Sequence, residues 1–525
     1  MAVNADLVSR RGFVHGAGGL TATVLLVPEA LAKPSRRPNL RGGKFAEGVA
    51  SGDPTTRGIT LWTRVSDVEG TGTVELQVAR DRGFRKVVAK DLIKASDRNA
   101  YSVKARVNGL KPYEQYYYRF HTRNEASPIG RFRTALPADS HQPVRFAFFS
   151  CQDFTFGYFN AHALMAKEDL DFVICLGDYI YAEDYYPIGP LGGIRDDPVG
   201  NSETLDQYRA KYLTYRSDPS LRKVHAKFPM INIWDDHEVQ DNYAGGVPVT
   251  GGLDPSLRFT DARKAAGHQA FFESLPTFGA KRGSGRIFRA TRFGRNVDLI
   301  LCDSRSYRDD QPCGDPVVGE ACPELPQPRK YLGRRQMNFV KKRLASSGAA
   351  WKVVANQLMI MHTYFPGGAI INFDSWMGYP TERRELVTHI KRRKIRDVVF
   401  VTGDIHTFVA GDVRVNETDK RAVATEFVGG SVTAPGLGEG GGGVLPGADP
   451  FNPKTPEGII NALKIANPWV KGAEFDHHGY GLAVATRKDF RCTLKRVAQI
   501  KRPGSARLPT GEFKYRVRRG RPSLL

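Results

Sequence analysis

Hydrophobic residues recur with two different periods along the chain, and the period changes near residue 140. Between residues 43 and 137 apolar and polar side chains alternate, as at Val74 and Leu76, and turn residues separate the runs. Alternation of this kind predicts an antiparallel β-sandwich of the fibronectin or immunoglobulin type. Within it, residues 110–112 followed by Tyr116 match a tyrosine corner. We therefore expect an all-β domain over residues 43–137.

Residues 140–500 follow a second pattern, in which short apolar runs alternate with longer amphipathic stretches. This order of elements predicts an α/β (α+β) fold. A chain of 525 residues is also too long for one ordinary core, which favours two domains. We expect helices at residues 160–168, 205–215, 261–273, 334–346 and 381–394.

Five apolar runs of the second domain end in polar or ionisable residues. They are residues 146–149, 172–176, 230–234, 351–355 and 398–401. In open α/β sheets, ligands bind beyond the carboxyl ends of the strands. A single aspartate after a strand is usually a cap or a turn residue, but five such ends favour a shared site. The candidate metal ligands at these ends are Cys151, Asp178, Tyr181, Asp236, Asp404 and His406.

The donor types indicate which metals this site would hold. Aspartates are hard oxygen ligands suited to calcium or manganese, and the carboxylate of Asp178 can bridge two cations. Tyr181 and His406 suit a trivalent or borderline cation, and Cys151 adds a thiolate. A set of histidine and cysteine alone would have indicated zinc. The set as a whole predicts iron at one position and a cation that prefers carboxylates at the other.

Several motifs at these strand ends resemble those of one known family. They are Ser150-Cys151, Gly-Asp-Tyr-Ile-Tyr at 177–181, Trp-Asp-Asp-His-Glu-Val at 234–239 and Gly-Asp-Ile-His at 403–406. Together they resemble the metallophosphoesterase superfamily, and within it the alkaline phosphatase D (PhoD) family, from about residue 43 to about 490. The resemblance implies a metallophosphoesterase sandwich for residues 140–500, preceded by a PhoD-type N-terminal β-sandwich.

The resemblance also implies the metals and their ligands. Fe(3+) would be held by Cys151, Asp178 and Tyr181, and Ca(2+) would lie nearby with Asp178 as a bridge. Asp404 and His406 would complete the cluster, and their division between the metals stays open.

Several residues near the predicted ligands have two possible roles each. Asp236 stands where related phosphoesterases have asparagine before a catalytic histidine, here His237. Asn242 and Asn356 are weaker candidates for binding metal or phosphate, and each also fits a hydrogen bond at a turn or strand end. His237 would contact the phosphoryl oxygens or protonate the leaving alkoxide, or else it would orient Asp236. We expect Asp178 and His237 to be the catalytic residues.

These residues predict an enzyme that hydrolyses phosphomonoesters or phosphodiesters. A metal-activated hydroxide or oxo group would attack the phosphorus in line. One alternative is a phospholipase D-like phosphodiesterase on the same scaffold. Another, from a different class, is a non-catalytic protein that binds anionic polymers.

The N-terminus predicts export. Residues 9–14 are Ser-Arg-Arg-Gly-Phe-Val, a twin-arginine pattern, and Ala30-Leu-Ala32 offers a cleavage site after a short apolar run. We expect a signal peptide over 1–32, a linker over 33–42 and export by the twin-arginine translocation machinery. The mature protein would be secreted, periplasmic or associated with the cell wall, without a transmembrane segment.

Charge and cysteines complete the sequence picture. The formal net charge is +22 and the pI is about 9.7, which favours anionic partners or a simply basic surface. Residues 501–525 form a basic tail. Basic and aromatic residues do not interleave as in nucleic-acid binders, so nucleic acid is not expected as a dedicated partner. In an oxidising compartment, Cys313 and Cys322 would form a disulfide.

Overall fold

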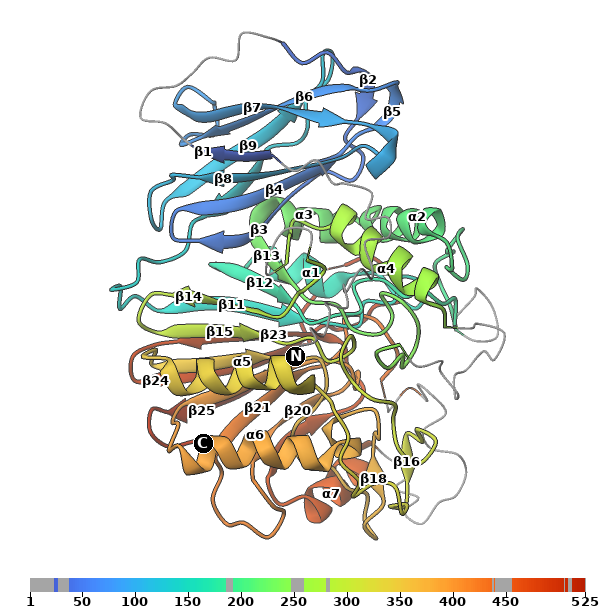
Figure 1. Ribbon diagram of the computed structural model, residues 1–525, viewed down its shortest axis with the longest axis vertical. Coiled ribbons are helices and arrows are strands. Elements are labelled where there is room, and N and C mark those ends of the chain that lie inside the picture. Colours follow the sequence, from blue (N-terminus) through green and yellow to red (C-terminus); the bar gives the residue numbers. More distant parts are fainter. Residues whose placement is uncertain are drawn as a thin grey trace, which may run out of the picture.

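In a computed structural model of the protein, a β-sandwich stands above a larger domain of two sheets and flanking helices (Figure 1). The structure describes residues 23–26, 37–185, 192–246, 259–279, 284–436, 439, 456–504, 506–508 and 512–524. Apart from residues 23–26, the expected signal peptide lies outside the described residues, as do residues 33–36 of the expected linker. No described helix is long and apolar enough to cross a bilayer.

The N-terminal sandwich has the predicted alternation. One layer is the sheet β10-β9-β6-β7, and the facing layer contains β8, β4 and β3. Apolar residues between the layers form a core of their own. The tyrosine corner is present, because the backbone N–H of Lys111 donates to the hydroxyl of Tyr116 at 3.0 Å. The strands are β2 (Arg41–Lys44), β3 (Val49–Thr55), β4 (Gly58–Arg64), β5 (Ser66–Glu69), β6 (Gly72–Ala79), β7 (Val87–Ala95), β8 (Ser102–Asn108), β9 (Gln115–His121) and β10 (Gly130–Arg133).

The sandwich shares a sheet with the second domain, which the sequence did not predict. Strand β3 pairs in parallel with β13 (Pro229–Asn232), through Ser51 opposite Pro229 and Gly52 opposite Met230. A ten-stranded sheet therefore runs through both domains in the order β1-β8-β4-β3-β13-β12-β11-β23-β24-β25. Strand β1 (Thr23–Leu26), inside the expected signal peptide, pairs with β8 at the far edge.

The second domain packs this sheet against a seven-stranded one, with a large apolar core between them. On the first sheet lie β11 (Val144–Phe149), β12 (Phe172–Cys175), β23 (Gly479–Ala485) and β24 (Asp489–Arg496). The second sheet, in the order β14-β15-β17-β19-β21-β20-β22, comprises β14 (Arg289–Phe293), β15 (Val297–Leu301), β17 (Trp351–Ala355), β19 (Val398–Thr402), β20 (Phe408–Val413), β21 (Ala424–Gly429) and β22 (Val470–Glu474). The predicted ligand-bearing strands thus fall on two sheets rather than one.

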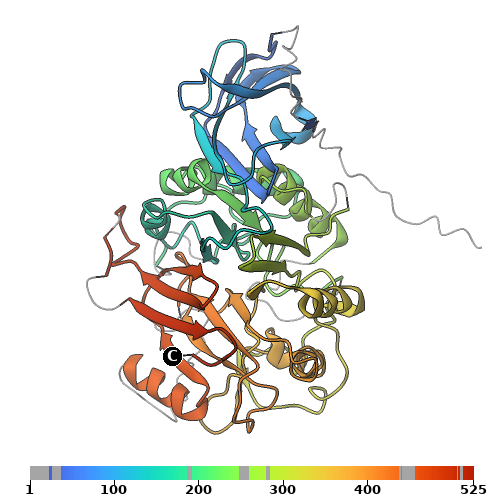
Figure 2. The ribbon, with the colours of Figure 1, turned by 90° about the vertical axis from the view of Figure 1, so that its left-hand side faces the viewer.

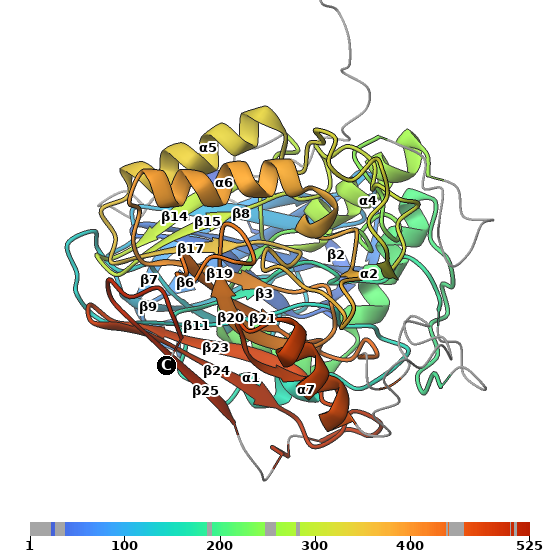
Figure 3. The same cartoon turned by 90° about the horizontal axis from the view of Figure 1, so that it is seen from below.

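Helices flank the sheets. The helices α5 and α6 lie side by side on one flank, opposite β23–β25 (Figure 3). All five predicted helices are present, and α3 was not predicted although Asp218 caps it and Pro219 starts it. The helices are α1 (Asn160–Met165), α2 (Leu205–Arg216), α3 (Pro219–Lys227), α4 (Asp261–Ser274), α5 (Gly333–Ser346), α6 (Pro380–Arg392) and α7 (Pro456–Ala466).

The C-terminal segment is not a separate tail. Strand β25 (Phe513–Arg518) pairs antiparallel with β24 and closes one edge of the ten-stranded sheet (Figure 2). Phe513, Tyr515 and Val517 face the core side, while the lysine and arginines between them are exposed. The expected boundary at residue 500 is therefore wrong, because the count of basic residues concealed a strand with a period of two.

Candidate metal centre

Four loops at the carboxyl ends of strands bring the predicted ligands together. Cys151 follows β11, Asp178 and Tyr181 follow β12, and Asp236 follows β13. From the opposite sheet, the loop after β19 carries Asp404 and His406. The two facing sheets thus deliver these side chains to one buried place, as expected for ligands at strand ends.

The backbone is strained at four of these candidate ligands. Cys151, Asp178, Asp404 and His406 have positive φ angles of 57°, 51°, 68° and 56°. Residues with a side chain rarely adopt this left-handed region, and such strain gathers at functional sites. Just before Asp178, Gly177 has φ of 116°, and a Cβ there would lie 2.4 Å from the Cβ of Asp235. The tight turn after β12 therefore requires glycine.

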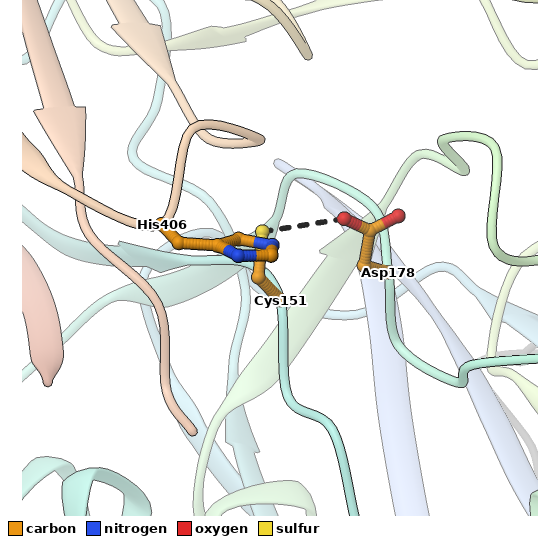
Figure 4. Close-up of side chains that lie close together, drawn as sticks. All are labelled: Cys151, Asp178 and His406. Atoms are coloured by element: carbon orange, nitrogen blue, oxygen red, sulfur yellow. Dashed lines mark hydrogen bonds between the residues drawn. The ribbon is translucent and has the colours of Figure 1, made fainter. Parts of the chain in front are cut away.

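The first group of ligand atoms surrounds Cys151 (Figure 4). The thiol of Cys151 lies 3.2 Å from Oδ2 of Asp178, and the Tyr181 hydroxyl lies 3.0 Å from Nε2 of His406. Nδ1 of His406 faces the carbonyl of Pro435 at 2.9 Å, so this nitrogen carries the hydrogen and Nε2 keeps its lone pair. Ligand atoms of Cys151, Asp178 and His406 all lie within 4.8 Å of one another.

Two further groups are built from carboxylates. Asp178, Asp236 and His237 form one, and Asp235, Asp236 and Asp404 form the other, again with ligand atoms within 4.8 Å. Asp178 and Asp236 each belong to two groups, so the three groups form one continuous cluster. Sequence analysis missed Asp235, although it stands directly beside Asp236.

Arg305 is the largest omission of the sequence analysis. It is fully buried, and its Nε lies 2.5 Å from Oδ1 of Asp235. Its Nη2 lies 2.7 Å from Asp374, 3.3 Å from Asp236 and 3.6 Å from Asp404. Arg305 comes two residues after Asp303, which follows a further buried strand, β15, and that strand end was the available signal. The guanidinium group neutralises part of the cluster and holds Asp235 and Asp374 in fixed positions.

Glu183 was also missed, and it holds His237. Oε2 of Glu183 lies 2.9 Å from Nδ1 of His237, and the imidazole ring stacks on Tyr181 with ring centroids 4.1 Å apart. Nε2 of His237 lies 4.0 Å from Asp236. Burial alone would lower the pKa of His237, but Asp236 and Glu183 raise it well above the usual range.

Glu238, next to His237, forms hydrogen bonds with the backbone of the ligand loops. Its buried carboxylate accepts hydrogen bonds from the backbone N–H groups of Asp178 at 3.0 Å, Tyr179 at 2.7 Å and Asp235 at 2.7 Å. The loops after β12 and β13 are thereby tied together, which fixes the spacing of Asp178 and Asp236.

Burial and the neighbouring carboxylates disfavour ionisation of Asp178 and Asp404 unless positive charge is added. Burial and Asp236 raise the pKa of Asp178 well above its usual range. Burial and Asp374 raise the pKa of Asp404 to about 7. Burial would raise the pKa of Asp236 as well, but Arg305 and His237 hold it at about 2. Oδ1 of Asp178 is buried and lacks a hydrogen-bond partner. A bound cation fits this donor set, because it would satisfy that oxygen and neutralise the remaining charge.

The two asparagine candidates occupy other environments. The amide of Asn242 donates to Asp315 at 2.8 Å, and its backbone N–H donates to Asp236 at 2.7 Å. The side chain of Asn356 bonds the carbonyl of Leu358 and the indole of Trp376 after β17. Asn356 therefore makes a strand-end hydrogen bond, whereas the amide of Asn242 bonds a residue distant in the sequence and its backbone lies against the cluster.

A disulfide-closed loop reaches the edge of the cluster. The structure joins Cys313 and Cys322, and the short strand β16 (Val318–Gly319) between them pairs with β18 (Ile370–Ile371). The backbone N–H of Asn372 donates to the carbonyl of Val317 at 2.6 Å, and the Asn372 amide donates to Asp404 at 2.9 Å. The loop thus positions a direct partner of Asp404.

The two facing sheets, with ionisable side chains buried at their carboxyl ends, define a metallophosphoesterase fold. A purple acid phosphatase, PPD1 from yellow lupin (Lupinus luteus) seeds, shares this fold with a TM-score of 0.52, 13% identity and coverage of 86% of this chain and 72% of that chain.

Within this class, the chain belongs to the PhoD-like phosphatase family. The family model matches residues 146–494, and that of the PhoD-like phosphatase N-terminal domain matches residues 30–136. Alkaline phosphatase D of Bacillus subtilis (strain 168) is 34% identical over 529 residues, covering 96% of this chain and 87% of that protein. A solved structure described as PhoD superposes with a TM-score of 0.83 and 31% identity, over 93% of each chain.

Proposed function

We propose that this protein is an exported, metal-dependent phosphoester hydrolase that acts on phosphomonoesters or phosphodiesters. The observation that carries the proposal is the convergence of Cys151, Asp178, Tyr181, Asp404 and His406 from separate loops into one buried cluster. Relatives named as phosphatases support the same reaction class.

The donor chemistry supports two kinds of cation. Cys151, Asp178 and Tyr181, with His406 beside them, would hold Fe(3+), because thiolate, phenolate and imidazole suit iron. Asp236 and Asp404 offer carboxylate oxygens suited to Ca(2+), and Asp178 lies between the two sets. Bound cations would neutralise phosphate oxygens and supply Lewis acidity.

His237 is the proton donor of the proposed reaction. Glu183 fixes the ring through Nδ1, which leaves Nε2 free to protonate the leaving oxygen or contact a phosphoryl oxygen. The other reading, in which His237 only orients Asp236, rests on the 4.0 Å separation between them. Replacement by glutamine distinguishes the two, because a lost proton donor lowers kcat most for esters with poor leaving groups.

The test compares three substrates and the metal content of one preparation. Purified exported protein is assayed with an aryl phosphomonoester, a simple phosphodiester and phosphatidylcholine, and elemental analysis measures iron and calcium. We expect hydrolysis of the first or second substrate, bound iron, and a visible absorption band that Tyr181→Phe removes. Preference for phosphatidylcholine would favour the phospholipase D-like alternative. Active protein without metal or colour would refute the assigned iron site.

Export is the part of the proposal carried by the N-terminal sequence alone. Arg10 and Arg11 precede the apolar run expected of a twin-arginine leader. Replacing both with lysine is expected to leave the folded enzyme inside the cell. Unchanged export of that variant would contradict this route.

A further inference from the structure

The end of the catalytic domain opposite the candidate metal centre carries a cluster of exposed basic side chains. They lie in the turn before β15, in the loop before β19 and in the turn before β24. The remaining ones lie at the end of β25, which runs antiparallel to β24 and so ends beside its start. We define the basic rim as Arg295, Arg396, Arg487, Lys488, Arg518 and Arg521, all of which are exposed.

Backbone and side-chain hydrogen bonds hold these segments together across the two sheets. The carbonyl of Arg295 accepts from the N–H of Ala350 at 2.9 Å. The indole of Trp351, the next residue, donates to the carbonyl of Thr486 at 2.7 Å. The turn that carries Arg295 and the turn that carries Arg487 therefore lie against the same edge of β17.

The C-terminal arginines join the same end. The backbone N–H of Arg519 donates to the carbonyl of Lys488 at 3.0 Å, and the N–H of Gly520 donates to Asp397 at 2.5 Å. Arg518 and Arg521 are thereby placed between the turn of Lys488 and the loop of Arg396. The rim is a surface fixed by the fold, not a mobile run of charge.

Nearby acids do not neutralise the rim. Asp397 is 7% exposed and Asp489 is 3% exposed, and each is held by local partners. Asp139 is an exposed acid on the turn beside Arg295. In the described part of the chain, no carboxylate forms an ion pair with Arg487, Lys488, Arg518 or Arg521. These four charges are available to an external anion.

The residue types of the rim favour one kind of anionic partner over others. Five of its six residues are arginine, whose planar fork matches phosphate oxygens. The large apolar side chains exposed in the described chain are Tyr307 and Val317, which follow β15, and Ile465 on α7, so none lies in the segments that form the rim. An interfacial membrane anchor would need such apolar groups, and single-stranded nucleic-acid sites use aromatic groups for stacking.

We propose that the basic rim binds a flexible polymer that carries repeated phosphate groups. The carboxyl ends of the strands, and the metal centre with them, lie at the other end of the sheets. The rim would therefore hold the enzyme on an anionic polymer while the centre stays open to phosphoesters. Arg295, Arg396, Arg487 and Lys488 lie within the range of the family match, and Arg518 and Arg521 lie beyond residue 494, where that match ends.

The test measures binding of the metal-loaded protein to fluorescent long-chain polyphosphate at low and moderate salt. The rim variant is Arg487→Gln, Lys488→Gln, Arg518→Gln and Arg521→Gln. The matched control removes four exposed charges from the sandwich: Arg82→Gln, Arg85→Gln, Lys86→Gln and Lys94→Gln. We expect the rim variant to bind about ten-fold more weakly at low salt and to show a shallower salt dependence, by roughly 0.7 per lost phosphate contact. The control should change less than about three-fold, and both should hydrolyse a small aryl phosphate like the wild type.

Three outcomes would overturn the proposal. Equal weakening in both variants would show that only the overall net charge matters. Unchanged binding in the rim variant would place the polymer elsewhere. In a parallel arm with vesicles of phosphatidylglycerol and phosphatidylcholine, a larger rim-dependent loss for vesicles than for polyphosphate would identify a membrane surface instead. The proposed hydrolase can fail independently, because its assay uses small esters that do not need the rim.

Discussion

The two ends of the catalytic domain's sheets differ in how their charged side chains are placed. At the carboxyl ends, Asp178, Asp235 and Asp236 are buried within ligand distance of one another or of Arg305. At the amino ends, the basic rim stands in water, where a charge loses little hydration and needs no partner. Burying several carboxylates together is unfavourable unless a cation compensates their charge. Folding alone does not require such a cluster, so its presence indicates a functional site.

The largest effect is expected when one buried aspartate is replaced by asparagine at the metal centre and, as a control, one at the basic rim. Asp178→Asn keeps the shape of the side chain but removes the negative charge shared by two ligand groups. We expect kcat/KM for an aryl phosphate to fall by about 10³-fold or more, with loss of bound metal. The matched control is Asp397→Asn at the basic rim, also buried and also at positive φ. A comparable loss of activity in the control would mean that the two ends do not differ as described.

Arg305 allows the acidic end to be altered without removing an acid. Arg305→Met leaves Asp235 without its counter-charge and leaves Asp374 with Arg308 alone, so we expect a loss of stability of about 3–5 kcal/mol. Added Ca(2+) should restore part of it, because a divalent cation can replace the missing positive charge. Thermal unfolding with and without calcium measures this, with Arg305→Lys as the variant that retains charge. A variant as stable as the wild type and indifferent to calcium would contradict the assigned role.

The same contrast explains how far the sequence could predict this molecule. The alternation in the sandwich and the apolar runs before Cys151, Asp178, Asp236 and Asp404 are local patterns, and the structure contains the predicted strands. Each candidate ligand was predicted because it lies shortly after such a run. The motifs around them added the family, which the comparisons confirm.

What the sequence did not predict depends on contacts between distant segments. Arg305 belongs to the site because two sheets pack face to face, and no local period reports that packing. The pairing of β3 with β13 joins segments about 180 residues apart in the chain. Glu183 follows a ligand loop, but only the folded position of His237 shows its role. The basic C-terminal segment hid a strand because its charge was more conspicuous than the alternation of Phe513, Tyr515 and Val517.

Removing the disulfide tests whether the loop that it closes is needed to keep Asn372 in contact with Asp404. Cys313→Ser with Cys322→Ser opens the loop that positions Asn372 against Asp404. Closing a loop of this length is worth about 2–3 kcal/mol in the chain-entropy model. We expect a loss of stability of that order and a decrease in kcat of a few fold, with smaller change in KM. Equal kinetics of the double variant and the wild-type enzyme would show that Asn372 stays in place without the bond.

The buried side chain of Lys104 provides the last test. If the positive charges of the basic rim are tolerated because they are exposed, a buried lysine should be hard to keep protonated. Lys104 on β8 is 1% exposed, and its ammonium group donates to the carbonyls of Phe272 and Thr277 where the sandwich meets α4 and the residues after it. Burial lowers the pKa of Lys104 from 10.5 to about 7. Between these two pKa values the unfolded chain binds more protons at this site than the folded protein, so stability rises as the pH rises through that window.

Lys104→Met removes the titrating group while keeping most of its length. Urea unfolding at pH 7 and pH 9 should show the wild type gaining on the order of 2 kcal/mol relative to the variant at the higher pH. The matched control is Lys94→Met on β7 of the same sandwich, where the side chain is exposed and should give no such difference. If both variants follow the wild type with pH, the charge on Lys104 is not excluded by burial. Positive charge would then be tolerated at the domain contact as readily as at the basic rim.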